Sequence, residues 1–158
     1  MQTAMNLQEL LNTVLEQEKT KHDYLADKGT AMHVYQDEEV EGLMLNLQSQ
    51  DYLQTFGITE SAHRQIAGRL NIPVKYYLRL LADHPDLLVP QINELFKREP
   101  ESRMLRTLEG NLRAFLSSSY RKLDNNTVLQ HALPQIIKGD IETKLLSSNI
   151  TDRKMYMK

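Results

Sequence analysis

The spacing of apolar residues changes along the chain, and this change constrains the fold more than any other feature of the sequence. Leucines alternate with other residues in 40–48, apolar residues recur at helical spacing between 60 and 98, and 103–120 reads as two strands. A two-residue period puts successive side chains on opposite faces of a strand, whereas a helical period gathers them along one side. Separate runs of strands and helices predict an α+β fold.

The first part of the chain is expected to contain one helix and two extended segments. The helix spans 6–19, with Asn6 as its N-cap and Glu9 three residues later, the spacing of a capping box. The extended segments span 30–36 and 40–48, and they flank an acidic turn.

The middle of the chain is expected to be helical and to lead into a hairpin and a short helix. The helices are predicted over 60–70, 74–82 and 87–98. The hairpin is predicted to turn at Glu109-Gly110-Asn111, because Gly tolerates a positive φ. Asp124-Asn125-Asn126 opens the short helix, which Pro134 is expected to end or kink. We expect a single domain over 1–158.

The end of the chain reads as two further strands. We expect 141–148 to pair antiparallel with 153–158 through a turn at 149–152. Met155 and Met157 lie two apart and therefore share one face, which needs cover. A chain that stops inside a strand favours a truncated product, and the remaining strand edge favours a homodimer.

Several classes of protein are excluded by what the sequence lacks. Without cysteine the chain has no disulfide, no thiolate nucleophile and no cysteine zinc site. No run approaches the roughly 18 apolar residues that span a bilayer, and the N-terminus lacks the features of a secretory signal. We therefore expect a cytoplasmic protein that does not bind membranes.

The charge is distributed unevenly along the chain. The net charge is −2, but residues 1–60 hold three basic and eleven acidic side chains, whereas 61–158 hold sixteen basic and ten acidic ones. This asymmetry is consistent with an unevenly solvated surface. It is also consistent with a basic binding face and an acidic partner or mask.

The predicted hairpin carries the densest group of basic side chains, with hydroxyls beside them. The expected binding residues are Arg103, Arg106, Arg113, Ser117, Tyr120, Arg121 and Lys122. Guanidinium groups fork onto phosphates and hydroxyls donate to phosphate oxygens, so the hairpin favours a nucleic-acid backbone or another anion. The alternative is that the arginines pair with nearby carboxylates, which are Glu99, Glu101, Glu109 and Asp124.

The segment 65–81 has the pattern of a helix-turn-helix. Ala67 is small enough for two helices to cross closely, and Asn71 tolerates the left-handed turn. Ile72, Tyr77 and Leu80 are expected to pack inward, while the second helix exposes Lys75, Tyr76 and Arg79. Lys75 and Arg79 are therefore candidate nucleic-acid contacts. The alternative is an ordinary pair of packed helices.

The residues of the acidic turn are candidates for binding a protein partner. They are Asp37, Glu38, Glu39 and Glu41. Such a cluster can mimic nucleic-acid phosphates toward a host defence protein, or it can be a solvated turn.

Patterns for catalysis or metal binding are weak. Glu142-Thr143-Lys144, with Asp124 and Asp140 upstream, has the arrangement of metal-dependent nucleases, in which two carboxylates hold magnesium. Glu-x-Lys is common on exposed strands, so we assign no catalytic residue, metal or cofactor. The five histidines do not have the spacing that places two ligands on one side of a helix.

Three runs of residues resemble a family found in phages and plasmids, known as domain of unknown function 932. They lie at Ala62–Tyr77, Arg106–Asn125 and Ile150–Tyr156, within a region that extends from Thr59 to Lys158. The resemblance implies that Ile72-Pro73 and Tyr76-Tyr77 are family scaffold. It implies no settled activity, and its members usually continue beyond this chain's end.

Together these patterns predict a non-enzymatic phage or plasmid accessory domain that binds nucleic acid or a nucleoprotein through the basic hairpin. The first alternative is a counter-defence factor that binds a protein through its acidic N-terminal third. The second alternative is a metal-dependent nuclease.

Overall fold

The computed structural model describes residues 6–121, 123–138, 148–150 and 155–157. These residues fall into two compact units. The central unit is 22–120, and the terminal unit combines the N-terminal residues up to Lys21 with those from Arg121 onward. The sequence predicts a single domain over 1–158, and whether the two units together form one domain stays a prediction.

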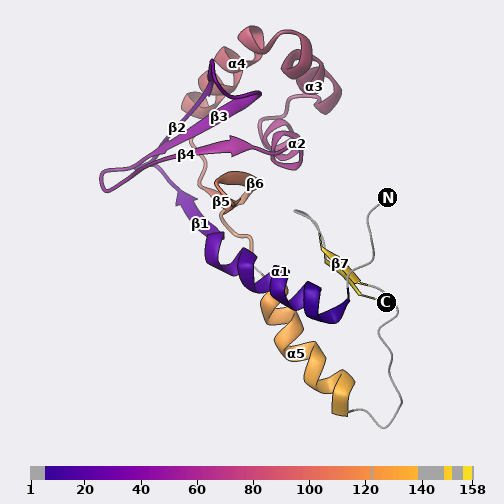
Figure 1. Ribbon diagram of the computed structural model, residues 1–158. Coiled ribbons are helices and arrows are strands. Elements are labelled where there is room, and N and C mark those ends of the chain that lie inside the picture. Colours follow the sequence, from indigo (N-terminus) through magenta and orange to yellow (C-terminus); the bar gives the residue numbers. More distant parts are fainter. Residues whose placement is uncertain (1–5, 122, 139–147, 151–154, 158) are drawn as a thin grey trace. The chain divides into compact units, whose positions relative to one another are not determined.

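The central unit is built on a six-stranded sheet with the strand order β1-β5-β6-β4-β3-β2. The strands are β1 (His22–Ala26), β2 (Ala31–Gln36), β3 (Leu43–Gln48), β4 (Leu53–Ile58), β5 (Arg103–Leu108) and β6 (Asn111–Ser117). Neighbouring strands are antiparallel except for β4 and β6, which are parallel. Three helices connect β4 to β5 along the chain. In the sheet, the hairpin β5–β6 lies between β1 and β4 (Figure 1).

Three helices lie together on one side of this sheet, as Figure 1 shows. They are α2 (Glu60–Arg69), α3 (Val74–Asp83) and α4 (Pro85–Arg98). α2 packs on β6 and α4 packs on β2, while α3 contacts both of these helices. The cross-strand neighbours Val34, Leu45 and Phe56 are buried in the core beneath the helices, which explains why the strands alternate in burial.

Two helix side chains continue the sheet's hydrogen bonding where strands do not. The side chain of Asn93 accepts from the backbone N–H of Val34 at 2.7 Å and donates to its carbonyl at 2.8 Å, along the edge strand β2. Gln65 Oε1 accepts from the N–H of Phe115 at 2.6 Å, beyond the short parallel pairing of β4 with β6. α2 and α4 are thereby fixed to the sheet by hydrogen bonds as well as by apolar contact.

The terminal unit consists of two helices and a small antiparallel pair of strands. These are α1 (Leu7–Thr20), α5 (Asn125–Lys138), β7 (Ser148–Ile150) and β8 (Met155–Met157). Leu10 and Val14 of α1 form a buried cluster with Leu129 of α5, and Ile150 and Met155 pack against it. Part of the apolar face of the last strand is therefore covered within this unit.

Most of the predicted elements are confirmed. α1 begins with the expected capping box, in which Asn6 Oδ1 accepts from the N–H of Glu9 and the Glu9 carboxylate accepts from the N–H of Asn6. The hairpin turns at Glu109 and Gly110, both with positive φ. α2, α3 and α4 occupy the predicted helical segments within a few residues.

Three expectations were incomplete or wrong. β1 and β4 were not predicted, so the sheet is larger than expected. α5 continues through Pro134 to Lys138, so Pro134 does not end the helix, and the alternative of a kink at this residue stays a prediction. β7 and β8 pair antiparallel as expected, with Ile150 opposite Met155, but Asn149 and Ile150 belong to β7 and not to the turn predicted at 149–152. Residues 141–147 and 151–154 lie outside the described part of the chain. Dimerisation through this edge stays a prediction.

Within the described residues, no helix combines the length and the apolar character that crossing a membrane requires.

Candidate nucleic-acid interface

The two arginines at the centre of the predicted basic hairpin are buried in the sheet. Arg103 is 7% exposed and Arg106 is 6% exposed. Arg103 Nη1 lies 2.7 Å from a Glu101 carboxylate oxygen, and Arg106 Nε donates to Asp23 Oδ1 at 3.0 Å. A buried guanidinium that is paired with a carboxylate is not presented to a phosphate. The prediction that Arg103 and Arg106 form the centre of the binding face is therefore corrected.

Other residues of the predicted hairpin site are also engaged within the unit. The guanidinium carbon of Arg106 lies 5.9 Å from the ring centroid of Tyr120, which helps to cover that arginine. The hydroxyl of Ser117 lies 2.7 Å from that of Ser119. Arg106, Ser117 and Tyr120 therefore make side-chain contacts within the central unit.

Of the remaining basic residues of the hairpin region, Arg113 is the one that the structure describes on a strand of the central unit. The β5–β6 register places Arg106 opposite Ala114 and Thr107 opposite Leu112, so Arg113 is an extra, half-buried residue at a bulge. Arg121 is exposed but belongs to the terminal unit. Lys122 lies outside the described residues.

The α2–α3 connection has the expected helix-turn-helix features. Ala67 is fully buried, and Asn71 adopts a φ of 55°, the left-handed conformation that its residue type tolerates. Ile72 packs against the core, and Tyr77 and Leu80 are buried in it. The sequence therefore predicted the local geometry of this helix pair correctly.

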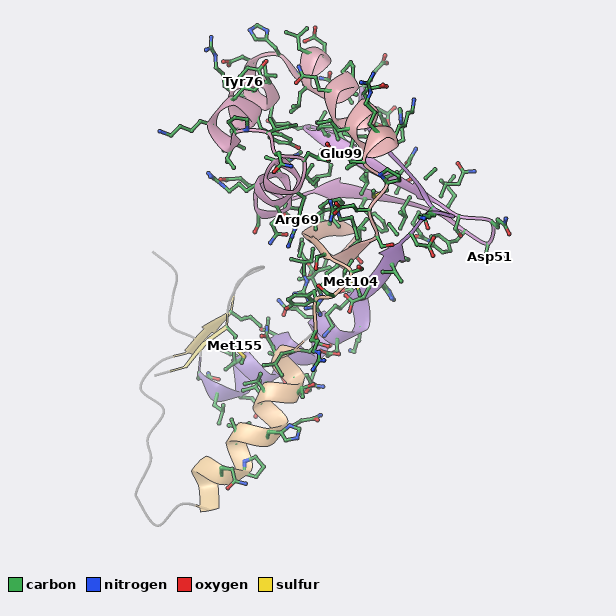
Figure 2. The ribbon with its side chains drawn as sticks, turned by 180° about the vertical axis from the view of Figure 1, so that it is seen from behind. Asp51, Arg69, Tyr76, Glu99, Met104 and Met155 are labelled. Carbon is green, nitrogen blue, oxygen red and sulfur yellow. The ribbon has the colours of Figure 1, made fainter. Side chains whose placement is uncertain are left out.

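The outer side of α3 carries Lys75, Tyr76 and Arg79, which we call the α3 patch. All three side chains are exposed, and Tyr76, whose position on α3 is labelled in Figure 2, is 48% exposed. Lys75 and Arg79 are four residues apart and Tyr76 and Arg79 three apart, so they are neighbours on the helix surface. Among the described residues, neither cation of the patch forms an ion pair.

Three exposed cations on the other helices are paired with carboxylates, whereas Arg69 on α2 and Lys97 on α4 are exposed and, like the α3 patch, form no ion pair among the described residues. Lys19, Arg64 and Arg98 each pair with a glutamate three or four residues earlier, at 2.6 to 2.7 Å. Lys75 has no carboxylate at these spacings, and Asp83, four residues after Arg79, makes no ion pair with it in the described structure. The α3 patch is therefore an uncompensated pair of positive charges on a helix surface.

Beneath the α3 patch, a buried polar pair joins α2 to α3. His63 Nδ1 lies 2.7 Å from the hydroxyl of Tyr77, and both residues are buried. Burial lowers the pKa of His63 from 6.5 to about 4, and the charge of Glu60 only partly offsets this effect. Burial also raises the pKa of Tyr77 well above its ordinary value. Both side chains are therefore neutral at neutral pH and serve to hold the two helices together.

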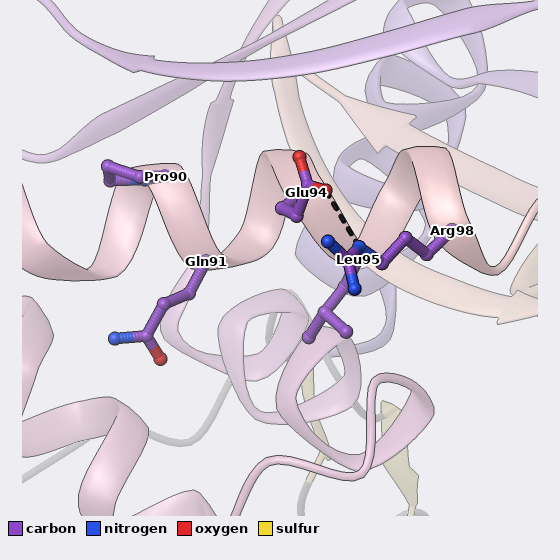
Figure 3. Close-up of a pocket in the computed structure, with 5 residues that line it drawn as sticks. All are labelled: Pro90, Gln91, Glu94, Leu95 and Arg98. Atoms are coloured by element: carbon purple, nitrogen blue, oxygen red, sulfur yellow. Dashed lines mark hydrogen bonds and ion pairs between the residues drawn. The ribbon is translucent and has the colours of Figure 1, made fainter.

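A hollow of about 560 Å³ lies along the outer side of α4. It is lined by Pro90, Gln91, Glu94, Leu95 and Arg98, all from one helix (Figure 3). Glu94 and Arg98 pair with each other at 2.7 Å, and this interaction lowers the pKa of the Glu94 carboxyl. An open hollow whose charges compensate each other offers little to an ionic ligand.

The described residues contain no group of three or more histidines and carboxylates placed to hold a metal ion. Asp124 forms an ion pair with Lys21 at 3.3 Å in the terminal unit. Asp140, Glu142 and Lys144, on which the nuclease alternative depends, lie outside the described residues.

The acidic turn predicted to bind a partner forms the exposed loop between β2 and β3. The carboxylate of Asp37 accepts from the N–H of Glu39, which fixes the start of the loop. Glu38, Glu39 and Glu41 are exposed, and Val40 between them is 46% exposed. The loop therefore presents charge around one apolar side chain.

Comparison with known proteins finds no match to a protein-family model, a curated protein or a solved structure. The resemblance of 59–158 to domain of unknown function 932 therefore stays a prediction.

Proposed function

We propose that this protein is a non-enzymatic accessory domain that binds nucleic acid through the α3 patch. The observation that carries the proposal is the pair of exposed, uncompensated cations Lys75 and Arg79 beside the exposed ring of Tyr76. The proposal moves the binding face from the hairpin 103–122 to α3, because Arg103 and Arg106 are buried and paired.

The spacing of the two cations suits a phosphate backbone. Side chains one helical turn apart are neighbours, with Cβ atoms roughly 5–6 Å apart. Both can therefore reach successive phosphates of one strand and release the counterions held there. Two like charges at this spacing disfavour the isolated helix slightly, and a polyanionic ligand removes that repulsion.

The test is a salt-dependent binding titration of the full chain with a labelled oligonucleotide. The double variant Lys75→Ala/Arg79→Ala should bind more weakly and reduce the slope of log affinity against log salt by about two. The matched control is Lys28→Ala/Lys97→Ala, which removes the same charge from two exposed lysines elsewhere. The control should retain wild-type affinity.

Two results would count against the proposal. One is equal loss of affinity in the patch variant and in the control, because binding would then depend on net charge alone. The other is the absence of binding at low salt by protein that circular dichroism shows to be folded.

A second candidate function is protein binding by the acidic loop. The observation that favours it is the exposed Val40 flanked by Glu39 and Glu41, because an apolar side chain ringed by charge is a common docking feature.

Neutralising the acidic loop with Asp37→Asn, Glu38→Gln, Glu39→Gln and Glu41→Gln tests this second function. Asn keeps the oxygen that accepts from the Glu39 N–H, so the loop should keep its shape. A host protein captured by wild type should be lost by this variant, and equal capture would refute acidic mimicry.

A further inference from the structure

We infer that the ligand of the α3 patch is single-stranded nucleic acid, with an unpaired base stacked on the ring of Tyr76. This inference rests on the proposed function and adds to it the class of nucleic acid that is bound. It follows from what α3 buries, from the surroundings of Tyr76 and from the geometry of base stacking.

The exposed side of α3 carries too few base-reading side chains for α3 to act as a groove-reading helix. Tyr77 and Leu80 are buried, and Val74 and Leu78 on adjoining sides of the helix also pack against the core. A recognition helix protrudes into the major groove and brings three or four side chains to base edges. The narrow exposed side of α3 offers only Lys75 and Arg79 as strong donors to bases.

Tyr76 is the most exposed tyrosine of the central unit, and most of the other tyrosines there make side-chain contacts. Tyr24 lies against Tyr52 and Phe56 with centroids 5.8 and 5.3 Å away. The hydroxyl of Tyr77 forms a hydrogen bond with His63, and the guanidinium of Arg106 lies over the ring of Tyr120. Tyr76 is 48% exposed, and its ring makes no contact with another ring or a cation among the described residues. Tyr35 of β2 also makes no ring or cation contact among the described residues, but it is less exposed than Tyr76.

An exposed aromatic ring beside two cations matches the chemistry of a single strand. In a duplex, each base has neighbours stacked on both faces, so a ring on a helix surface has no free base to contact. An unpaired base has a free face, and stacking on tyrosine tolerates any base. Lys75 and Arg79 would hold the phosphates on either side of the stacked base.

The first experiment compares binding of a single-stranded oligonucleotide of about 15 nucleotides with binding of the duplex of the same sequence. The wild-type protein should bind the single strand more tightly. Tyr76→Leu should lower single-strand affinity by about tenfold or more, while duplex affinity stays close to wild type. Tyr76→Phe, which keeps the ring, should keep most of the single-strand affinity.

The second experiment places a fluorescent reporter at the stacking position. The chain contains no tryptophan, so Tyr76→Trp introduces a single indole. Stacking with a base should quench its fluorescence on addition of the single strand, in parallel with binding. Leu53→Trp, at an exposed position of β4, is the matched control and should show no quenching.

The outcomes separate this inference from the proposed function. Equal or tighter binding of duplex, or wild-type affinity for the single strand in Tyr76→Leu, would overturn base stacking. If Lys75→Ala/Arg79→Ala still weakened binding in that case, the α3 patch would remain the site. If neither form of nucleic acid bound to the folded protein, both proposals would fall.

Discussion

The hydrogen bond between His63 and Tyr77 is the residue-scale contact that most directly supports the α3 patch. It places a titratable imidazole where water does not reach, between the helix that precedes the turn and the helix that bears Lys75 and Arg79. Because a charged imidazole is poorly solvated there, the folded protein favours neutral His63.

The stability of the central unit should consequently fall in mild acid. The pKa of His63 is lowered from 6.5 to about 4 on folding, so the unfolded chain binds this proton first. Stability is fully present above about pH 6.5 and is lost as the pH falls toward 4, by up to about 3 kcal/mol. Urea unfolding at several pH values measures this loss. His63→Gln keeps a hydrogen-bonding side chain without the titration, and an unchanged pH dependence in that variant would refute the account.

The pair Asp23–Arg106 tests whether the hairpin arginines are structural. Both side chains are largely buried, so Asp23→Ala leaves a guanidinium without its carboxylate and should destabilise the central unit by about 3–5 kcal/mol. Lys75→Ala, on the exposed side of α3, should change stability by less than about 0.5 kcal/mol. Thermal unfolding compares the two variants. If Asp23→Ala lost as little stability as Lys75→Ala, Arg106 would again be a candidate for contact with a ligand.

At the scale of the elements, the sequence predicted those with strong periodicity and missed the two strands whose alternation is weak. The three middle helices and the β5–β6 hairpin follow from apolar spacing and turn residues. β1 contains His22 and Asp23, and β4 contains Gly57, so neither shows a clear alternation. A Cβ on Gly57 would meet Oδ1 of Asn111 on the neighbouring strand β6, so a larger residue there would require the Asn111 side chain to turn aside.

The same difference explains how much of the candidate site was predictable. The exposure of Lys75 and Arg79 follows from the helical period of α3, which the sequence carries locally. The burial of Arg106 depends on Asp23, a residue 83 positions away on an unpredicted strand. The β5–β6 bulge at Arg113 also depends on strand register, which local pattern does not specify.

The contact between α4 and the sheet edge gives a prediction at this scale. Asn93 satisfies both the N–H and the carbonyl of Val34, so Asn93→Leu leaves two buried backbone groups without partners. The cost should be about 2–5 kcal/mol. Hydrogen exchange at the Val34 amide should accelerate in the variant relative to amides of β6. Unchanged protection at Val34 would show that this edge does not depend on α4.

At the scale of the whole molecule, the charge of the central unit makes the α3 patch a local feature. Residues 22–120 contain ten basic and fourteen acidic side chains, so this unit is acidic overall. Net charge alone would repel nucleic acid. Binding by this unit is therefore expected at a surface where cations are concentrated. The outer side of α3 carries Lys75 and Arg79, which form no ion pair among the described residues, and Asp83 at its end is the single carboxylate of this helix.

The most direct test of this account is a map of backbone amide chemical shifts during titration with a single-stranded oligonucleotide. The largest changes should cluster at Lys75, Tyr76 and Arg79, with small changes along β5 and β6. Saturation of these changes should occur at the affinity measured by fluorescence. Changes centred on the hairpin 103–117, or no changes in α3 under conditions where the oligonucleotide binds, would contradict the claim that α3 carries the binding site.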